Sequence, residues 1–298
     1  MSDITEVSAG EQHPCGDAFQ LRSNECSTKE GKATVLYVVC TALEESGFLN
    51  AFSTRLGGVS RLPAESLNLG YFKNDPSSNV AENRRRFLDA IGASGTKLAT
   101  LNQTHSVNIY HVKSQSELKN ELKDEEPDAD ALVTKEPNIV LAVKTADCLP
   151  ILIADPKSGV IAAIHAGWRG TAGRITERTL ADLMRDFGVN TRNCLAALGP
   201  AACGDCYEVG RDVIDRFKSE FGYWSRLLKP KNNGKANLDI QAANRQQLAY
   251  CGFSDERIFT APYCTMHNND SFFSYRREGS GVGKMLSVIG RYVFLGAK

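Results

Sequence analysis

Three short apolar runs near the middle of the chain constrain its fold more than any other feature. They read NIVLAVKTA, CLPILIA and GVIAAIHA, at residues 138–146, 148–154 and 159–166. Runs of this length, bounded by polar and turn-forming residues, are typical of buried strands. The turn sequence DPKSG (155–159) joins the last two runs, which predicts a β-hairpin.

The rest of the chain mixes strand and helix patterns. ATVLYVVC (33–40) is typical of a strand, and apolar residues spaced through 80–91 predict a helix that ends at a glycine. A second helical pattern covers residues 174–188. We therefore expect a single α/β domain over residues 32–298, with mixed, partly antiparallel sheets flanked by helices. A flexible polar tail at residues 1–31 would precede it.

The totals exclude several classes of protein. Lys plus Arg equals Asp plus Glu, at 35 each, so the formal net charge is zero, whereas a general nucleic-acid binder needs clustered positive charge. No apolar run approaches the ~20 residues that span a bilayer, and the polar N-terminus does not resemble a signal peptide. Nine cysteines are an odd number in a chain that can form a core without disulfides. We expect a cytoplasmic monomer with reduced cysteines and with no nucleic-acid or membrane partner.

The hairpin predicts which side chains meet at its open end. If a four-residue loop follows Ala154, that residue pairs with Gly159, and the same register places Cys148 directly opposite His165. Directly opposed residues share one face of a sheet, with Cβ atoms roughly 4.5–5.5 Å apart. A slip of one residue would instead place the two side chains on opposite faces.

A thiol beside an imidazole suits two chemistries. Zinc binds Cys sulfur and His nitrogen, and His105 in NQTHSVNIY is a candidate third ligand. Three ligands would leave a fourth position open, as in catalytic zinc sites. Alternatively, Cys148 is a nucleophile and His165 is its base. In a third interpretation, Cys148 packs in the core and His165 only ends a strand.

Glycines and an arginine follow His165 directly, in GWRGTAGR (167–174). A strand end that leads into a helix presents free backbone N–H groups and the positive end of the helix dipole. Arg169 adds a planar cation suited to phosphate or carboxylate. The segment predicts an anion site, and the alternative is a tight turn with a surface arginine.

Aromatic residues precede arginines in CTMHNNDSFFSYRR (264–277). Phe273 and its neighbour Phe272 could stack on a flat ring while Arg276 meets an anion. The alternative is a buried edge strand with solvated arginines.

Two further motifs resemble functional sequences but do not predict a functional site. CGDC, from Cys203 to Cys206, has the spacing of a redox pair or half a zinc knuckle. The sequence has no second C-x-x-C and no thioredoxin-like context, so we interpret the motif as structural. GSGVGKM has Glu278 where a phosphate-binding loop needs its first glycine, and Met285 follows Lys284 where Ser or Thr would coordinate magnesium. It predicts no nucleoside triphosphatase.

Several motifs, taken in order, resemble the YfiH/YlmD-like family. They cover about residues 48 to 290 and read FSTRLGGVS, SLNLG, NQTHS, DADALVT, TADCLPILIADP, IHAGWRGT, LGPAACGDCYEVG and CTMHNNDSFFSYRR. Members are known variously as laccase-domain or polyphenol-oxidase proteins and as purine nucleoside phosphorylases. The resemblance implies an α/β fold related to cytotoxic necrotising factor.

The resemblance also implies a zinc site and a substrate class. The family's metal positions fall on His105, Cys148 and His165, and Arg55 and Asn68 would help to line the pocket. The implied chemistry is phosphorolysis of adenosine, inosine, guanosine and methylthioadenosine, with deamination of adenosine. The implied partners are purine nucleosides and phosphate. Where many relatives have adjacent cysteines before a tyrosine, this chain has CGDCYEV.

The two implied activities would use the residues differently. A metal-activated water would serve deamination, whereas phosphorolysis needs a phosphate held below the ribose, for which Arg55 and Arg169 are candidates. Asp147 is a candidate general acid or base, although its side chain is expected on the opposite face of the hairpin from Cys148. The rival interpretations are a cysteine hydrolase or amidase that uses Cys148 and His165, and a copper-dependent polyphenol oxidase.

The number of histidines bears on the choice of metal. A multicopper cluster needs on the order of eight or more imidazole ligands. The chain has five histidines, and His13 lies in the expected tail. We therefore favour zinc over copper as the cofactor.

Overall fold

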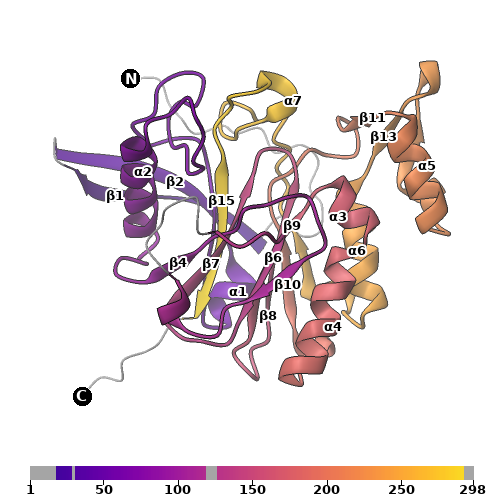
Figure 1. The fold of residues 1–298 in the computed structure, drawn as a ribbon, viewed down its shortest axis with the longest axis horizontal. Coiled ribbons are helices and arrows are strands. Elements are labelled where there is room, and N and C mark those ends of the chain that lie inside the picture. The colour runs from indigo at the N-terminus through magenta and orange to yellow at the C-terminus, as the bar shows by residue number, and fades with distance from the viewer. Residues whose placement is uncertain (1–17, 29–30, 119–125, 292–298) are drawn as a thin grey trace.

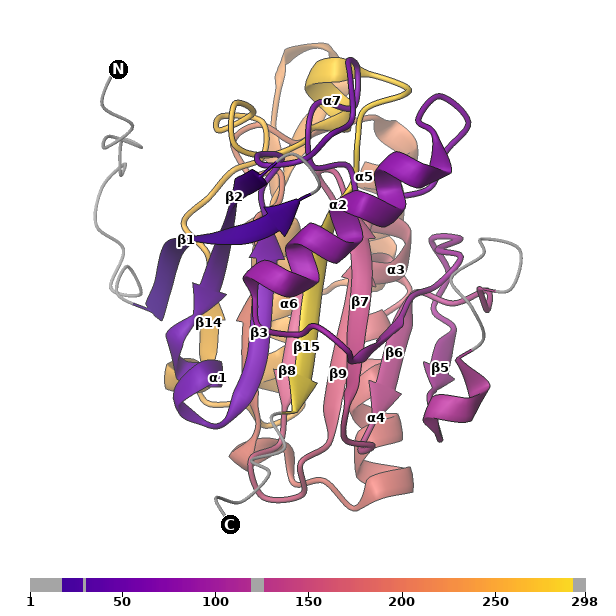
Figure 2. The same cartoon turned by 90° about the vertical axis from the view of Figure 1, so that its left-hand side faces the viewer.

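Two six-stranded β-sheets packed face to face form the body of the protein. The computed structural model describes residues 18–28, 31–118 and 126–291. Figure 1 and Figure 2 show the sheets in the middle of the molecule, with helices covering their outer faces. This layered arrangement confirms the expected α/β class with mixed, partly antiparallel sheets.

The first sheet is antiparallel except at one edge, where β4 runs parallel to β7. In spatial order its strands are β1 (Phe19–Thr28), β2 (Gly31–Cys40), β3 (Phe48–Ser53), β15 (Met285–Arg291), β7 (Ile139–Thr145) and β4 (Lys97–Ala99). The final strand of the described chain thus lies in the centre of this sheet, between β3 and β7.

The second sheet carries the predicted hairpin at its centre. In spatial order its strands are β14 (Ile258–Thr260), β10 (Leu195–Leu198), β8 (Leu149–Ala154), β9 (Ile161–Ala166), β6 (Ala131–Thr134) and β5 (Ile109–His111). Only its two outer pairs are parallel. A small third sheet contains β11 (Glu208–Val209), β13 (Ala236–Leu238) and β12 (Leu228–Pro230).

Helices cover the outer face of each large sheet (Figure 1). On the first sheet lies α2 (Ser77–Ala90), and on the second lie α3 (Trp168–Ala172), α4 (Ile175–Phe187) and α6 (Ile240–Tyr250). The remaining helices are α1 (Thr41–Glu45), α5 (Arg211–Glu220) and α7 (Tyr275–Glu278), with single 3₁₀ turns at Gln115–Glu117, Thr191–Asn193, Trp224–Arg226, Asn232–Gly234 and Asp255–Arg257. Within the described residues, no helix has both the length and the apolar character to cross a membrane.

The main apolar core lies between the two sheets. Phe52 and Leu141 from the first sheet meet Leu152 and Ala163 from the second, and all four are at most 1% exposed. The other faces of the two sheets bury further side chains under α2 and under α4 and α6. Strands buried on both faces are nearly continuous apolar runs, as β7, β8 and β9 are.

Most predicted elements are confirmed, but the expected N-terminal tail is wrong in part. Residues 19–28 form β1, which pairs antiparallel with β2 along its whole length. Most side chains of β1 are exposed, because it is an edge strand, so its polar composition resembled that of a tail. Residues 1–17 lie outside the described part of the chain.

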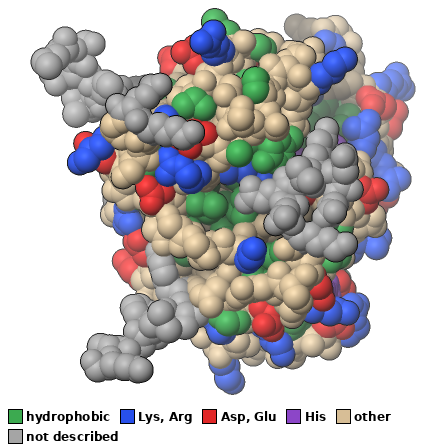
Figure 3. Space-filling model, turned by 60° about the vertical axis from the view of Figure 1, so that its left-hand side comes forward, with side chains coloured by type: hydrophobic (Ala, Val, Ile, Leu, Met, Phe, Trp, Pro, Cys, Tyr) green, Lys and Arg blue, Asp and Glu red, His purple; other side chains and the backbone are tan. Residues whose placement is uncertain are grey.

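Lys, Arg, Asp and Glu side chains all appear on the face shown in Figure 3. Figure 3 shows Lys and Arg side chains interspersed with Asp and Glu on the face that it presents, with no area of a single sign among the described residues there.

The hairpin forms, but its register differs from the prediction. Ala154 pairs with Ile161, and Pro150 pairs with His165. The loop begins one residue later than expected, because the amide of Asp155 still donates to the carbonyl of Val160, at 2.9 Å. Moving the loop by one residue shifts every pair by two positions, which preserves the face that each side chain occupies.

Candidate active site

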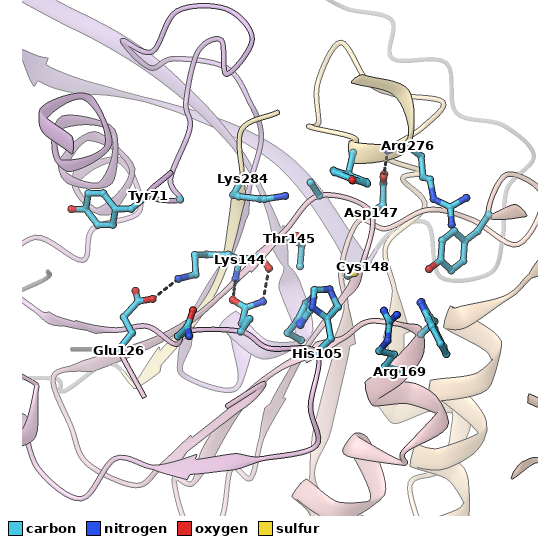
Figure 4. A pocket seen from close by; sticks show the side chains of 18 residues that line it. Tyr71, His105, Glu126, Lys144, Thr145, Asp147, Cys148, Arg169, Arg276 and Lys284 are labelled. Atoms are coloured by element: carbon cyan, nitrogen blue, oxygen red, sulfur yellow. Dashed lines mark hydrogen bonds and ion pairs between the residues drawn. The ribbon is translucent and has the colours of Figure 1, made fainter. Parts of the chain in front are cut away.

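Three predicted ligands meet at one end of the second sheet. Cys148 lies in a bend just before β8, His165 is the penultimate residue of β9, and His105 lies in the loop before β5. Their sulfur and nitrogen ligand atoms all lie within 4.8 Å of one another, and the two imidazole rings meet edge to face with centroids 5.0 Å apart. Figure 4 shows Cys148 and His105 facing the same pocket. The structure therefore brings the three residues together, and their role as metal ligands stays a prediction.

The corrected register explains how Cys148 reaches His165. Extended by one pair beyond the ladder, the register places Cys148 opposite Gly167, so that His165 is its diagonal neighbour on the same face. Diagonal neighbours lie within reach of long or aromatic side chains. The observed pairing differs from the predicted one by two residues, but it still places the side chains of Cys148 and His165 near each other on one face of the sheet.

Gly167 leaves the space that these ligands occupy. A Cβ atom added there would lie 3.1 Å from Cδ2 of His105 and 3.2 Å from Sγ of Cys148. Both separations are closer than ordinary van der Waals contact, so a side chain would push the two ligands apart. The backbone φ of Gly167 is −70°, a value that any residue adopts. A glycine is therefore needed at this position because the side chains of His105 and Cys148 lie so close to it, and not because of its backbone conformation.

Gly167→Ala is expected to weaken metal binding by about 10–100-fold, the range seen when groups that orient ligands are altered. The fold should survive, because the methyl group meets side chains and no backbone atom within that distance. Competition with a chromophoric chelator measures the affinity. Gly222→Ala is the matched control, because a Cβ at that position would meet nothing within 4 Å. Equal affinities in the two variants would contradict the prediction.

Asp130, which the sequence analysis did not select, orients two of the ligands. One oxygen of its fully buried carboxylate lies 2.7 Å from Nδ1 of His165 and accepts the amide N–H of His105 at 3.1 Å. The other oxygen accepts the amide and hydroxyl of Ser106 at 2.6 and 2.7 Å. A carboxylate on Nδ1 leaves Nε2 of the imidazole available as a ligand.

Strand pairing places Asp130 beside His165. Asp130 directly precedes β6, whose antiparallel register with β9 puts it opposite His165. Burial raises the pKa of Asp130, but hydrogen bonds from His165 and Ser106 lower it below its ordinary value. Asp130 is the second aspartate of the motif DADALVT. Its position beside His165 becomes evident only from the pairing of β6 with β9.

The pKa shifts of Cys148 and His165 favour a thiolate beside an imidazolium in the metal-free protein. Burial opposes ionisation of the thiol, but the charge of His165 and hydrogen bonds from both histidines lower the pKa of Cys148 to about 6. Burial likewise opposes protonation of the imidazole, but Cys148 and Asp130 raise the pKa of His165 to about 9. A thiolate is both the form that binds zinc and the form that acts as a nucleophile.

In metal-stripped protein, alkylation of Cys148 by iodoacetamide is expected to reach half its maximal rate near pH 6. Because the pKa is lowered, the thiolate persists above that pH and is lost only below it. Cys251 is the internal control, since burial raises its pKa to about 11. Peptide mass spectrometry across a pH series measures both sites. A Cys148 profile centred near pH 8.5, the ordinary thiol value, would contradict the ion pair.

The three ligands open into a pocket of about 400 Å³, a size typical of small-molecule sites. In Figure 4, Tyr71, Glu126 and Lys144 lie to one side of the ligands, and Arg169 and Arg276 lie to the other. Lys144 is joined to Glu126 by an ion pair of 2.7 Å. The pocket thus has an arginine-rich end and a mixed polar end, with the ligands between them.

Arg169 and Arg276 are exposed at the pocket, as an anion site requires. The guanidinium of Arg169 lies over the ring of Trp168, 4.3 Å from its centroid, and makes no ion pair within the described residues. That of Arg276 lies 4.7 Å from the ring centroid of Tyr207 and donates to the carbonyl of Glu208 at 2.6 Å. Aromatic stacking holds both cations in place while their remaining N–H groups face solvent.

Asp147 lies in the same pocket as Cys148, and the expectation that it faces the other way is wrong. Its backbone has a left-handed φ of 88°, so the alternation of an extended strand does not apply there. One carboxylate oxygen accepts the hydroxyl of Thr265 at 2.6 Å, and the other accepts the amide of Arg276 at 2.7 Å. Both oxygens are engaged in holding the segment that carries Arg276.

Arg55 and Phe273 do not line the pocket, contrary to the prediction. Arg55 makes two hydrogen bonds of 3.0 Å to the carboxylate of Glu278, and its guanidinium lies 4.6 Å from the ring centroid of Phe273. Phe273 is fully buried. Because Glu278 ends α7, this cluster anchors the helix that presents Arg276, so its contribution to the pocket is indirect.

Asn68 is also buried and outside the pocket lining. Its amide oxygen accepts the backbone N–H groups of Lys284 and Gly70 at 2.9 and 3.1 Å, and its nitrogen donates to Asp75 at 2.7 Å. Both Lys284 and Gly70 line the pocket. Asn68 therefore joins two pocket segments without contacting the cavity.

A second group of metal-type ligands lies outside the pocket. Cys203 and Cys206 of CGDC meet Cys264 and His267, with all four ligand atoms within 4.8 Å of one another. This group could hold a metal ion. The sequence analysis treated CGDC alone because its partner has the spacing C-x-x-H, in CTMH.

Comparison with known proteins agrees with this architecture. The family described as multi-copper polyphenol oxidoreductase laccase matches residues 49–292. The crystal structure of YlmD from Geobacillus stearothermophilus superposes with a TM-score of 0.81 at 32% identity, covering 86% of this chain and 96% of that chain.

Curated relatives extend over most of the chain. A purine nucleoside phosphorylase of Deinococcus radiodurans is 40% identical over 242 residues, which is 81% of this chain and 88% of the relative. An adenosine deaminase from an unknown prokaryotic organism is 35% identical over 250 residues, or 82% of this chain and 93% of the relative. The chain belongs to the YfiH/YlmD family of laccase-domain proteins, as a homologue of purine nucleoside phosphorylases and adenosine deaminases.

Proposed function

We propose that this protein is a zinc-dependent purine nucleoside phosphorylase that also deaminates adenosine. The observation that carries the proposal is the set of three ligands, His105, Cys148 and His165, at the centre of a pocket with two exposed arginines at one end. Relatives described as purine nucleoside phosphorylase and adenosine deaminase support the substrate class.

The residues fit a zinc ion. One thiolate and two imidazoles are typical zinc ligands, Gly167 leaves room beside them, and Asp130 fixes the orientation of His165. Bound there, zinc would supply a Lewis acid with one coordination position open to the pocket.

The pocket residues would divide the substrate between them. Arg169 and Arg276 would hold phosphate, since planar cations bind its oxygens in pairs. Tyr71, Tyr207 and Tyr275 line the cavity and offer faces on which a purine could stack. In phosphorolysis, a phosphate oxygen forms a bond to ribose C1′ as the bond from C1′ to the base nitrogen breaks, and the base leaves with that electron pair and takes up a proton.

Asp147 serves to position Arg276 in this scheme. Both of its carboxylate oxygens already accept hydrogen bonds, so we favour this role over proton transfer. The hydrogen bond from the amide of Arg276 to Asp147 would also fix the position of Arg276 relative to Cys148, the next residue after Asp147.

Incubation of the purified protein with adenosine, with and without phosphate, tests the function. Chromatography with mass detection should find adenine and ribose 1-phosphate only when phosphate is present, and inosine in either case. His165→Ala protein, prepared identically, should form none of these products, which controls for contaminating enzymes. Neither product from wild-type protein, or equal product from the variant, would reject the proposal.

A multicopper oxidase would need more imidazoles than the site provides. Of the five histidines in the chain, four lie in the described residues, and of these four only His105 and His165 line the pocket. His111 contacts Asp182, and His267 belongs to the cysteine group. The description of the matching family therefore does not extend to a copper cluster built from these residues.

The geometry also favours one alternative, a cysteine hydrolase. Cys148 contacts His165, and His165 in turn contacts Asp130. This is the arrangement of a nucleophile, its general base and a carboxylate that orients the base. Such an enzyme would be indifferent to metal removal, which separates the two candidates experimentally.

A further inference from the structure

The group of Cys203, Cys206, Cys264 and His267 joins two loops that are far apart in the sequence. The first pair lies between β10 and β11, and the second pair lies between β14 and α7. An isolated parallel bridge between Ala201 and Cys264 brings the two loops together. Each loop contributes ligands at positions i and i+3, as C-x-x-C and C-x-x-H.

The two sulfur–sulfur distances in this group are close to the edges of a zinc-sized tetrahedron, and the imidazole of His267 lies within hydrogen-bond distance of one of the sulfurs. With sulfur about 2.3 Å from zinc, two ligands of a tetrahedral site lie about 3.8 Å apart. The sulfur of Cys206 lies 3.5 Å from that of Cys203, 3.8 Å from that of Cys264, and 2.9 Å from Nε2 of His267. Disulfides need sulfur atoms about 2.05 Å apart, so the group has the spacing of ligands and not that of a bonded pair.

The surroundings also suit a thiolate cluster. The amide of Cys203 donates to the sulfur of Cys264 at 3.4 Å, and a hydrogen bond to the charged form of a group stabilises that form. Cys264 is buried, the other two cysteines are half-buried, and His267 is exposed. None of the four lines the active-site pocket.

We propose that Cys203, Cys206, Cys264 and His267 bind a second zinc ion, which is structural. Four protein ligands close the coordination sphere, whereas catalytic zinc sites keep a position open. This inference does not depend on the reaction proposed above, because its ligands are outside the pocket.

The second ion would brace one wall of the active site. Tyr207 follows Cys206 directly and stacks against Arg276, and Thr265 follows Cys264 directly and donates to Asp147. The bound metal would therefore hold in place the two loops that position the arginine end of the pocket.

Zinc content in a Cys148→Ser background tests the proposal without interference from the first site. Elemental analysis of that variant should find one zinc ion per chain. Adding His267→Ala should weaken the remaining zinc by more than about 100-fold in chelator competition, since even groups that only orient ligands contribute about 10–100-fold. His267 is exposed, so its removal should leave the fold intact. Cys251→Ser, in the same background, is the matched control and should bind zinc normally.

Peptide-resolved alkylation of the wild-type protein gives a second readout. Zinc should protect Cys203, Cys206 and Cys264 from iodoacetamide, and a chelator should expose them. The proposal is overturned if Cys148→Ser protein purified with zinc holds none. It is also overturned if a Cys203–Cys206 disulfide forms in the zinc-loaded wild type, or if zinc leaves the three thiols equally reactive.

Discussion

Protein stripped of metal by a strong chelator is expected to lose more than about 100-fold of its nucleoside phosphorolysis and deamination activity, and added zinc is expected to restore both. The reason is that in the proposed site His105, Cys148 and His165 would contribute three zinc ligands and leave the fourth position open to the reacting groups. Product formation from adenosine, measured before and after zinc is returned, gives the result.

The same experiment separates the zinc enzyme from the cysteine hydrolase. A hydrolase that uses the Cys148–His165 ion pair should keep its activity in the chelator and lose it on alkylation of Cys148. His165→Ala protein should stay inactive after zinc is added, which excludes rescue by a contaminating enzyme. Full activity in the stripped wild-type protein would refute the metal-dependent mechanism.

Asp130→Asn is expected to lower metal affinity at the active site by about 10–100-fold and to reduce activity at least in proportion. The amide is nearly the same size as the carboxylate, but it removes the charge that fixes the orientation and tautomer of His165. It also replaces an acceptor of two backbone amides in the His105 loop with a weaker one. Chelator competition and steady-state kinetics measure the two effects.

Asp155→Asn is the control for this substitution. Asp155 is also buried, but it lies in the loop at the opposite end of the hairpin, where it accepts from Lys157 and Ser158. The control should bind zinc and turn over substrate as the wild type does. If Asp130→Asn and Asp155→Asn have the same metal affinity, Asp130 does not orient the ligands.

The sequence predicted several elements of both sheets, because local patterns specify them. Apolar runs and the DPKSG turn predicted β7, β8 and β9, and helical spacing predicted α2 and α4. The edge strand β1 was missed, since most of its side chains face solvent and its residues have no apolar alternation. Burial of one face is what makes a strand visible in a sequence.

The register of the hairpin could not be predicted from the local sequence pattern alone. The turn residues were correct, but a hydrogen bond between Asp155 and Val160 moved the loop by one position. Because the pairing changed by two residues and not by one, Cys148 and His165 still lie on the same face of the sheet. Asp147 broke the same alternation through a left-handed backbone, which no strand pattern could predict.

By itself, the sequence determined the family, the strand and helix patterns of β2, β7, β8, β9, α2 and α4, and the candidate ligands His105, Cys148 and His165. Only the tertiary structure decided that Asp130 faces His165, that Arg55 and Asn68 brace the pocket from outside, and that CGDC meets CTMH. The physical reason is that secondary structure depends on residues a few positions apart. These contacts depend instead on which distant strands pair and in what register, which the packing of the whole core decides.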